Sequence, residues 1–541
     1  MLLNLLLLAA SVAHAFDCSS QAIQEFLPSN VSIKSAVWVP ENGIFNVPPS
    51  NVAYPESPTG LRALCAIEVH ATSSSNSSFN FGLFLPNGWN QRFLAVGNGG
   101  FAGGINWLDM GAGVGYGFAT MSTNTGHNST APDVTWSLNA PESKIDWGYR
   151  AMHESVVLSK KIIAAYYGSA STYNYYSGCS TGGRQGLRDI QLYPDDFDGV
   201  LAGAPAWWTS HLQTWTLKVA LYNLPRTAEH HIPESLFPII EAEVLKQCDP
   251  QDGVKDNIIS DPEGCDFYPE ALLCSNTTNS SSCLTIPQLD TLSHIQSDYV
   301  ETNQTFVFPR LSLGSESQWS VLLGDKSPST YGSQYIQYFV LNDPSWNIYD
   351  FNYSIVELAD AIQPGNASAT AFGALNAFKS KGGKVLHYHG LADGYIPTGS
   401  SEVFYKQVLR ATGKEDLGEW YRYFEVPGMQ HCSGTQAGVD APWYFAGGSQ
   451  AGSLSTSLHS VLGFSDPDHD ALLALMRWTE SGTAPERLVA TKWKNDTLQD
   501  SVLRQRPVCP YPRQAKYDGW GDVNKAECWK CELPWGGSTT Q

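Results

Sequence analysis

The chain has 541 residues, of which 42% are hydrophobic, 12% aromatic and 16% charged, a composition that supports a large folded core and excludes a disordered chain. Its 32 basic and 52 acidic side chains give a formal net charge of −20, which disfavours nucleic acid and anionic membrane surfaces as partners through charge repulsion. Length alone suggests roughly three to four domain-sized units.

The N-terminus is typical of a secretory signal peptide. An apolar run ends at Ala10, and Ala13-His14-Ala15 follows as a small-x-small cleavage site, so we predict removal of residues 1–15 and a mature start at Phe16. No later stretch reaches ~18 uninterrupted apolar residues, so no membrane anchor is expected. The eleven cysteines also suit an oxidising, extracellular compartment. Nine N-x-Ser/Thr sequons predict a secreted glycoprotein, and they begin at Asn30, Asn76, Asn128, Asn276, Asn279, Asn303, Asn352, Asn366 and Asn495.

Strand and helix patterns alternate along the first part of the chain, which is the rhythm of a parallel sheet with covering helices. We predict a strand at 93–96, a glycine turn at 97–100, a strand at 117–122, a helix at 148–167, a strand at 173–176, a helix ending at 192 and a strand at 199–204.

The alternation of strand and helix patterns stops after residue 205 and resumes near residue 383. Residues 206–382 hold four cysteines and five of the sequons, whereas strands at 384–389 and 420–426 and a helix at 470–481 continue the sheet pattern. We therefore predict one α/β core, built from residues 16–205 and 383–541, that is split by an inserted lid at 206–382.

A nucleophile elbow lies between the strand at 173–176 and the helix that follows. The sequence Gly178-Cys179-Ser180-Thr181-Gly182 matches G-x-S-x-G, and small residues permit the sharp turn that exposes the serine oxygen. This motif in this position predicts an α/β-hydrolase core with Ser180 as nucleophile. An oxyanion requires two donors, and we expect the N–H of Thr181 to be one. Gly99 and Gly100 are the candidates for the other, with Gly100 as the working assignment.

A serine nucleophile needs a general base and a carboxylate that orients it. In this fold both follow the serine in the chain, each on a loop after a strand. Asp393 lies just beyond the strand at 384–389, and His431 lies just beyond the strand at 420–426. His459 and His469 are alternatives, although neither follows so clear a strand.

Cys179 precedes Ser180, and Cys432 follows His431. If the serine and histidine meet, the two cysteines come within range of a disulfide. That bond would close a loop of 253 residues and contribute about 5 kcal/mol in the chain-entropy model. The alternative is that each cysteine pairs elsewhere.

The adjacent Cys-Ser, the later Asp and the adjacent His-Cys resemble the tannase and feruloyl esterase family of secreted fungal enzymes. The resemblance covers nearly the whole mature chain, including the Gly-Asn-Gly-Gly turn at 97–100 and the lid. It implies that a disulfide lies beneath a triad in which Ser180 attacks an ester carbonyl, His431 moves the proton and Asp393 orients the imidazole. The products would be a hydroxycinnamic or gallic acid and a sugar or small alcohol.

The lid contains an oxygen-rich loop at 248–258, with three aspartates around Gly253. Such a loop suits a hard cation, although its spacing is not that of an EF-hand, and an Asx-rich turn is the alternative. The family resemblance implies a structural Ca²⁺ held by the side chains of Asp249, Asp252 and Asp256 and by the carbonyls of Val254 and Ile258.

The remaining cysteines fit the pairs Cys18–Cys65, Cys248–Cys265 and Cys274–Cys283. Cys509 takes either Cys528 or Cys531; family spacing favours Cys531, and sequence does not settle connectivity. Lid tryptophans either line a pocket for a phenolic ring or form the core of the lid, and we favour the lid core for Trp207, Trp208, Trp215 and Trp319.

We therefore expect a secreted carboxylic ester hydrolase that releases ferulic or related hydroxycinnamic acids from plant cell-wall polysaccharide esters. A tannase is the nearest alternative, but tannases of this family are often cleaved in the lid at Lys-Arg, and this chain has no Lys-Arg pair. A serine peptidase on the same fold and an inactive glycosylated binding protein are more distant alternatives. The intact Ser180, Asp393 and His431 argue against the binding protein. No oligomeric state is predicted.

Overall fold

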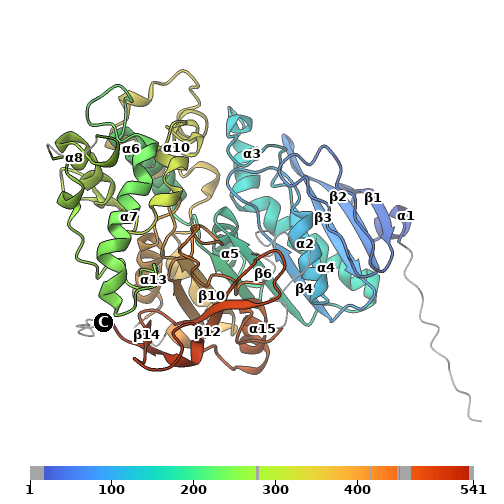
Figure 1. Ribbon diagram of the computed structural model, residues 1–541. Helices are drawn as coiled ribbons and strands as arrows, with labels where there is room; N and C mark the ends of the chain where they lie inside the picture. The colour runs from blue at the N-terminus through green and yellow to red at the C-terminus, as the bar shows by residue number, and fades with distance from the viewer. Residues whose placement is uncertain (1–17, 276–279, 414–416, 448–449, 451–464, 535–541) are drawn as a thin grey trace, which may run out of the picture.

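A nine-stranded sheet forms the centre of the molecule (Figure 1). The computed structural model describes residues 18–275, 280–413, 417–447, 450 and 465–534. The strand order is β1-β2-β3-β5-β4-β6-β7-β10-β11. The strands are β1 Val31–Val39, β2 Leu64–Ser74, β3 Ser77–Pro86, β4 Arg92–Val96, β5 Ala119–Thr123, β6 Tyr173–Cys179, β7 Gly199–Gly203, β10 Lys384–Gly390 and β11 Tyr421–Val426.

The sheet has an antiparallel part and a parallel part. Strands β1, β2, β3 and β5 pair antiparallel, and from β5 through β4, β6, β7 and β10 to β11 every pair is parallel. The parallel strands β5 and β7 are buried along their whole length, as expected when helices cover both faces. The carboxyl ends of β4, β6, β10 and β11 therefore meet along one edge, where the predicted site residues follow them.

Two hydrophobic clusters cover the sheet, one on each face. Along β4, Phe93 and Ala95 belong to one cluster and Leu94 and Val96 to the other, because successive strand side chains point to opposite faces. Side chains of α4, α5, α12 and α13 pack on the first face, and those of α2 and α15 on the second. The helices of the core are α1 Ser20–Gln24, α2 Trp107–Gly115, α3 Pro141–Ile145, α4 Ala151–Tyr167, α5 Thr181–Leu192, α13 Gly399–Thr412 and α15 Ala471–Ser481.

The inserted segment packs in two further hydrophobic clusters. One is centred on residues such as Trp215, Ile240 and Trp319, and in the other Tyr335 and Phe339 pack with Phe101 and Trp147 of the core. The helices of this segment are α6 Thr209–Tyr222, α7 Phe237–Cys248, α8 Ile286–Ile295, α9 Ser320–Leu323, α10 Thr330–Gln334, α11 Tyr353–Ile362 and α12 Leu375–Ser380, with a short hairpin of β8 Tyr299–Val300 and β9 Phe306–Phe308. Helices α6, α7, α8 and α10 lie on the left of Figure 1, away from the N-terminal strands β1–β3.

The predicted α/β-hydrolase core is confirmed, and every strand and helix predicted within it is present to within three residues at each end. The helix predicted from 148 begins as α4 at Ala151, because a wider π-helical turn occupies Asp146–Arg150. The boundaries of the lid stay a prediction. Near the C-terminus the chain adds two small hairpins, β12 Leu488–Trp493 with β13 Val502–Val508, and β14 Gln514–Tyr517 with β15 Trp529–Glu532. Among the described residues, no helix is long and apolar enough to cross a membrane.

Candidate active site

Ser180 occupies the sharp turn between β6 and α5. Its backbone has φ +62° and ψ −126°, a strained conformation for a residue with a side chain. The turn is held by the Ser180 N–H, which donates to the Gly203 carbonyl at 2.9 Å. A side chain at Gly178 could not be accommodated, since its Cβ would lie 2.8 Å from the carbonyl carbon of Gly182. The motif thus folds into the elbow that the sequence predicts.

Asp393 and His431 form a close pair on the loops after β10 and β11. His431 Nδ1 lies 2.7 Å from Asp393 Oδ2, and the Asp393 side chain is fully buried. The other oxygen, Oδ1, accepts from the N–H groups of Tyr395 at 2.8 Å and Ile396 at 2.9 Å. Burial alone raises the pKa of Asp393, but the neighbouring His431 and the hydrogen bonds from His389 and His431 outweigh it, so the pKa lies well below its ordinary value. Asp393 is therefore an ionised acceptor that fixes the orientation of the His431 ring.

Ser180 and His431 line one cavity of about 300 Å³, large enough for a small aromatic ester. The core contributes the elbow, the glycine turn and the histidine loop, while α6, α9 and α10 of the lid contribute the opposite wall. The lining residues are Gly99, Gly100, Ala131, Cys179, Ser180, Thr181, Ala206, Leu212, Gln213, Thr216, Val321, Leu322, Tyr331, Tyr395, Ile396, His431 and Cys432.

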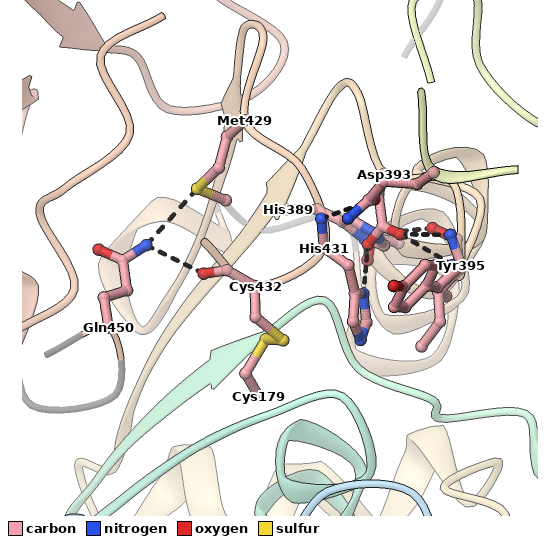
Figure 2. The surroundings of a disulfide bond; sticks show 11 residues. Cys179, His389, Asp393, Tyr395, Met429, His431, Cys432 and Gln450 are labelled. Atoms are coloured by element: carbon pink, nitrogen blue, oxygen red, sulfur yellow. Dashed lines mark hydrogen bonds and ion pairs between the residues drawn. A yellow bond between two sulfur atoms is a disulfide. The ribbon is translucent and has the colours of Figure 1, made fainter. Parts of the chain in front are cut away.

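The predicted disulfide between Cys179 and Cys432 is present and joins the loop of Ser180 to the loop of His431 at this cavity. The Cα atoms lie 5.9 Å apart, although 253 positions separate the residues in the chain. Figure 2 shows the bond beside His431, with Gln450 on its other side. The Gln450 amide donates to the Cys432 carbonyl at 3.0 Å and contacts Met429 Sδ at 3.5 Å. The serine and histidine loops are thus covalently held next to each other.

The two glycine candidates for an oxyanion donor differ in whether their backbone N–H already makes a hydrogen bond. The Gly99 N–H donates to the Tyr54 hydroxyl at 2.7 Å. Gly100 lies on the cavity wall with φ +54°, a conformation that favours glycine. Thr181, the other predicted donor, lines the same cavity at the N-terminus of α5. Because Gly99 is already engaged, Gly100 is the better candidate beside Thr181.

Comparison with known proteins agrees with this geometry. A family model described as "Tannase and feruloyl esterase" matches residues 64–321 and 329–532. The chain belongs to the tannase and feruloyl esterase family. Two curated members are a probable feruloyl esterase B-2 of Aspergillus terreus, 33% identical over 97% of this chain and 96% of the relative, and a probable feruloyl esterase B-1 of Aspergillus oryzae, 35% identical over 93% and 91%.

Two solved structures share the fold of the chain. Feruloyl esterase B from Aspergillus oryzae has a TM-score of 0.86 at 33% identity and covers 95% of this chain and all of its own. The tannin acyl hydrolase from Aspergillus niger, at 20% identity, has a TM-score of 0.73 over 96% of this chain and 95% of its own, which shows a shared fold. The chain is therefore an enzyme of a carboxylic ester hydrolase family.

Two residues that support the site, His389 and Gln318, were not identified from the sequence. His389 Nε2 lies 3.0 Å from Asp393 Oδ2, and the His389 side chain is fully buried at the end of β10. Gln318, from the lid turn Glu316–Gln318, uses its amide oxygen to accept from the N–H groups of Gly394 at 3.0 Å and His431 at 3.1 Å. The spacing of His389, four residues before Asp393, was a visible signal, whereas nothing in the sequence indicates the lid contact.

Two of the four tryptophans form the lid core that we favoured. Trp215 and Trp319 are buried in the cluster of the inserted segment, whereas Trp207 is buried in the cluster on the first face of the central sheet. Trp208 is half-buried between these clusters and stacks on His211 with ring centroids 3.6 Å apart. Tyr331 and Tyr395 provide the aromatic surface of the cavity instead. Of the alternative bases, His469 contacts Asp466 at 3.0 Å beside α15, and His459 lies outside the described residues.

The proposed calcium loop begins at the end of α7 and is closed by the disulfide Cys248–Cys265. Burial raises the pKa of Asp252 to about 6, and its Oδ2 atom is buried without a hydrogen-bond partner. Burial also raises the pKa of Asp249. Asp256 also forms an ion pair outside the loop, because its Oδ2 contacts Arg506 Nη2 at 2.6 Å. An unpaired buried carboxylate oxygen among oxygen donors fits a hard cation.

The remaining cysteines pair as predicted, and Cys509 takes Cys531. Cys528 is a free, buried thiol. The asparagines of the described sequons are all exposed, as glycan attachment requires, while Asn276, Asn279 and the predicted signal peptide lie outside the described residues. The described pairs besides Cys179–Cys432 are Cys18–Cys65, Cys248–Cys265, Cys274–Cys283 and Cys509–Cys531. The exposed sequon residues are Asn30, Asn76, Asn128, Asn303, Asn352, Asn366 and Asn495.

Proposed function

We propose that this protein is a secreted serine esterase that releases ferulic or related hydroxycinnamic acids from plant cell-wall polysaccharide esters. The observation that carries the proposal is the shared cavity of Ser180 and His431, with Asp393 2.7 Å behind the imidazole. The relatives named as feruloyl esterases, at 33–35% identity over nearly the whole chain, support a hydroxycinnamoyl group as the acyl part of the substrate. The signal-like N-terminus, exposed sequons and disulfides support secretion.

The proposed reaction is a two-step acyl transfer. His431 keeps its proton on Nδ1, in a hydrogen bond to the Asp393 carboxylate, which leaves Nε2 as the base that takes the Ser180 hydroxyl proton. The serine oxygen attacks the ester carbonyl, and the oxyanion accepts from the N–H groups of Thr181 and Gly100. Collapse expels the alcohol, which receives the proton from His431. Water, deprotonated by His431, then hydrolyses the acyl-enzyme and releases the acid and Ser180.

We propose that Ca²⁺ in the lid is structural. Asp249, Asp252 and Asp256 would hold it with the carbonyls of Val254 and Ile258, and the ion would neutralise buried carboxylates such as Asp252. Removal of Ca²⁺ with a chelator should lower the melting temperature of the wild type but not of an Asp252→Asn variant. Equal melting temperatures of the wild type with and without Ca²⁺ would contradict the site.

One experiment tests the activity. Purified protein and a Ser180→Ala variant are incubated with methyl ferulate, methyl gallate and a peptide amide, and the released acids are quantified. We expect ferulate release that the substitution abolishes. Release that survives the substitution contradicts the triad, release of gallate alone identifies a tannase, cleavage of the amide alone identifies a peptidase, and no turnover at all favours a binding protein.

A further inference from the structure

Three potential metal ligands meet between α4 and α5, away from the lining of the cavity that holds Ser180. His153 comes from α4, Asp189 from α5, and Asp196 from the connection between α5 and β7. Each offers one ligand atom, and these atoms all lie within 4.8 Å of one another. Within the described part of the chain, this is the one group of three histidine, cysteine, aspartate or glutamate side chains that meets this distance.

The Asp189 carboxylate has no ion-pair or donor partner in direct contact among the described residues. Its residue is 1% exposed, neither of its oxygens accepts from a donor group, and its one side-chain contact is with the carboxyl group of Asp196. Burial and the neighbouring Asp196 raise the pKa of Asp189 well above its ordinary value. The nearby Lys160 charge lowers the pKa of Asp189 only in part, because the Lys160 ammonium group donates its hydrogen bonds to the backbone carbonyls of Asp195 and Asp196. Two adjacent carboxylates in this setting require a bound cation or a shared proton.

We propose that His153, Asp189 and Asp196 form a site for a divalent transition-metal ion, with Zn²⁺ as the best fit. His153 Nδ1 and Asp196 Oδ2 are hydrogen-bonded at 2.6 Å, so a metal ion would replace the proton between them. A nitrogen ligand beside two carboxylates favours Zn²⁺ over Ca²⁺ or Mg²⁺, which prefer oxygen ligands alone. The His153 side chain is 23% exposed, which provides an entry path and room for a water molecule as the fourth ligand.

Such an ion would stabilise the framework behind the elbow. Helix α5 begins at Thr181, directly after Ser180, and carries Asp189 two turns later. A metal at this point would tie α5 to α4 and to the connection that enters β7. Its role is therefore positioning and stability, because none of the three ligands lines the cavity.

Zinc binding to the full-length enzyme tests the site. The protein is stripped with a chelator and returned to excess Ca²⁺, so that the lid loop cannot account for the signal. Zinc affinity and stoichiometry are then measured by calorimetry, and melting temperatures are measured with and without Zn²⁺. We expect one Zn²⁺ per chain and a higher melting temperature with the metal.

Three variants separate a metal site from a shared proton. Asp189→Asn removes a ligand and a buried charge at constant shape, His153→Gln removes the nitrogen ligand at the rim, and Asp195→Asn neutralises an exposed neighbour as the matched control. We expect Asp189→Asn and His153→Gln to weaken Zn²⁺ binding at least about tenfold, since loss of even a partner of a ligand costs about 10- to 100-fold. Asp195→Asn should bind as the wild type does.

Either of two results would overturn the proposal. Absence of stoichiometric Zn²⁺ binding, with Asp189→Asn as stable as the metal-free wild type, would assign a shared proton to the two carboxyl groups. Zinc binding that both ligand variants retain would place the metal elsewhere. If Asp189→Asn fails to fold, His153→Gln decides alone, because its side chain is partly exposed and its loss leaves the buried carboxylates in place.

Discussion

His389 Nε2 lies 3.0 Å from Oδ2 of Asp393, the same oxygen that His431 Nδ1 contacts at 2.7 Å (Figure 2). Because His389 Nε2 also lies 3.0 Å from the Ile396 carbonyl, it faces two acceptors and must carry the proton. His389 Nδ1 lies 2.7 Å from the Ser401 hydroxyl on the other side of the ring. The buried histidine is therefore a hydrogen-bond donor that holds Asp393 in place from behind.

Replacement of His389 by leucine should lower kcat while KM changes little. A hydrogen bond to a charged group contributes about 1.5–3 kcal/mol, so loss of the positioning of Asp393 predicts a fall of about 10- to 100-fold in kcat. KM is spared because His389 is absent from the cavity lining. Steady-state kinetics with methyl ferulate check this, with His294→Gln, an exposed lid histidine, as control. An unchanged kcat for His389→Leu would show that Asp393 is held well enough without it.

Gln318→Leu should lower both activity and stability, since one amide oxygen ties the lid to the N–H groups of Gly394 and His431. Each buried donor left unpaired costs about 1–3 kcal/mol. Ser317→Ala is the matched control, because it removes neighbouring hydrogen bonds with Gln430 and Glu241 but leaves the N–H groups of Gly394 and His431 paired. We expect a lower kcat and melting temperature for Gln318→Leu, and identical behaviour of the two variants would contradict the role.

The core and the positions of Ser180, Asp393 and His431 could be predicted from sequence because their signals are local. A strand that runs straight into Gly178-Cys179-Ser180 determines both the elbow and its place on the sheet, and Asp393 and His431 each follow a strand directly. The first three strands carried weaker signals. β1 follows a sheet edge where burial alternates irregularly, and residues such as Trp38 remain 48% exposed.

Contacts between distant segments could not be predicted. The amide of Gln318 reaches His431 across 113 positions, and no property of either residue in the sequence indicates the partner. The cavity wall is a similar case, since Tyr331 and Tyr395 line it while the more conspicuous tryptophans are core. The partner of Cys509 could not be predicted for the same reason. Cys528 and Cys531 are only three positions apart, and the fold brings Cys531 next to Cys509.

Removal of the Cys179–Cys432 disulfide by paired alanine substitutions should destabilise the protein more than removal of Cys274–Cys283. The two bonds close loops of 253 and 9 positions, which correspond to about 5 and about 3 kcal/mol in the chain-entropy model. Only the first pair lines the cavity, so only its loss should also lower kcat. Chemical denaturation and kinetics measure both effects. A larger loss of stability from the shorter loop would contradict the entropic account.

The free energy of unfolding should fall as pH rises between about 4.5 and 8 because of Glu316. Burial, aided by the nearby Glu241, raises the pKa of Glu316 from 4.5 to about 8. In that window the folded state binds a proton that the unfolded state has lost, so stability decreases with pH. Glu316→Gln, which resembles the protonated acid, should flatten this dependence. Exposed Glu270→Gln is the control, and equal slopes for both variants and the wild type would exclude Glu316 as the cause.

Gln213 should distinguish substrates by their ring hydroxyl. It lines the cavity from α6, and its Oε1 atom is buried without a hydrogen-bond partner, so it can accept from a phenol. We expect Gln213→Leu to lower kcat/KM about tenfold for methyl ferulate and to leave methyl cinnamate, which lacks the hydroxyl, unchanged. Thr216→Val is the control, because the Thr216 hydroxyl donates to its own helix at Leu212. Equal losses for both esters would indicate a general packing effect.

The Cys179–Cys432 bond makes the enzyme a covalent ring that contains the whole inserted segment. Any single backbone cut between residues 206 and 382 falls inside this ring, so the two resulting polypeptides stay linked. Ser180 would then belong to one polypeptide and Asp393 and His431 to the other, with the disulfide directly beneath them. A protease that nicks the lid would therefore yield a two-chain esterase, which migrates as one species until a reducing agent separates it.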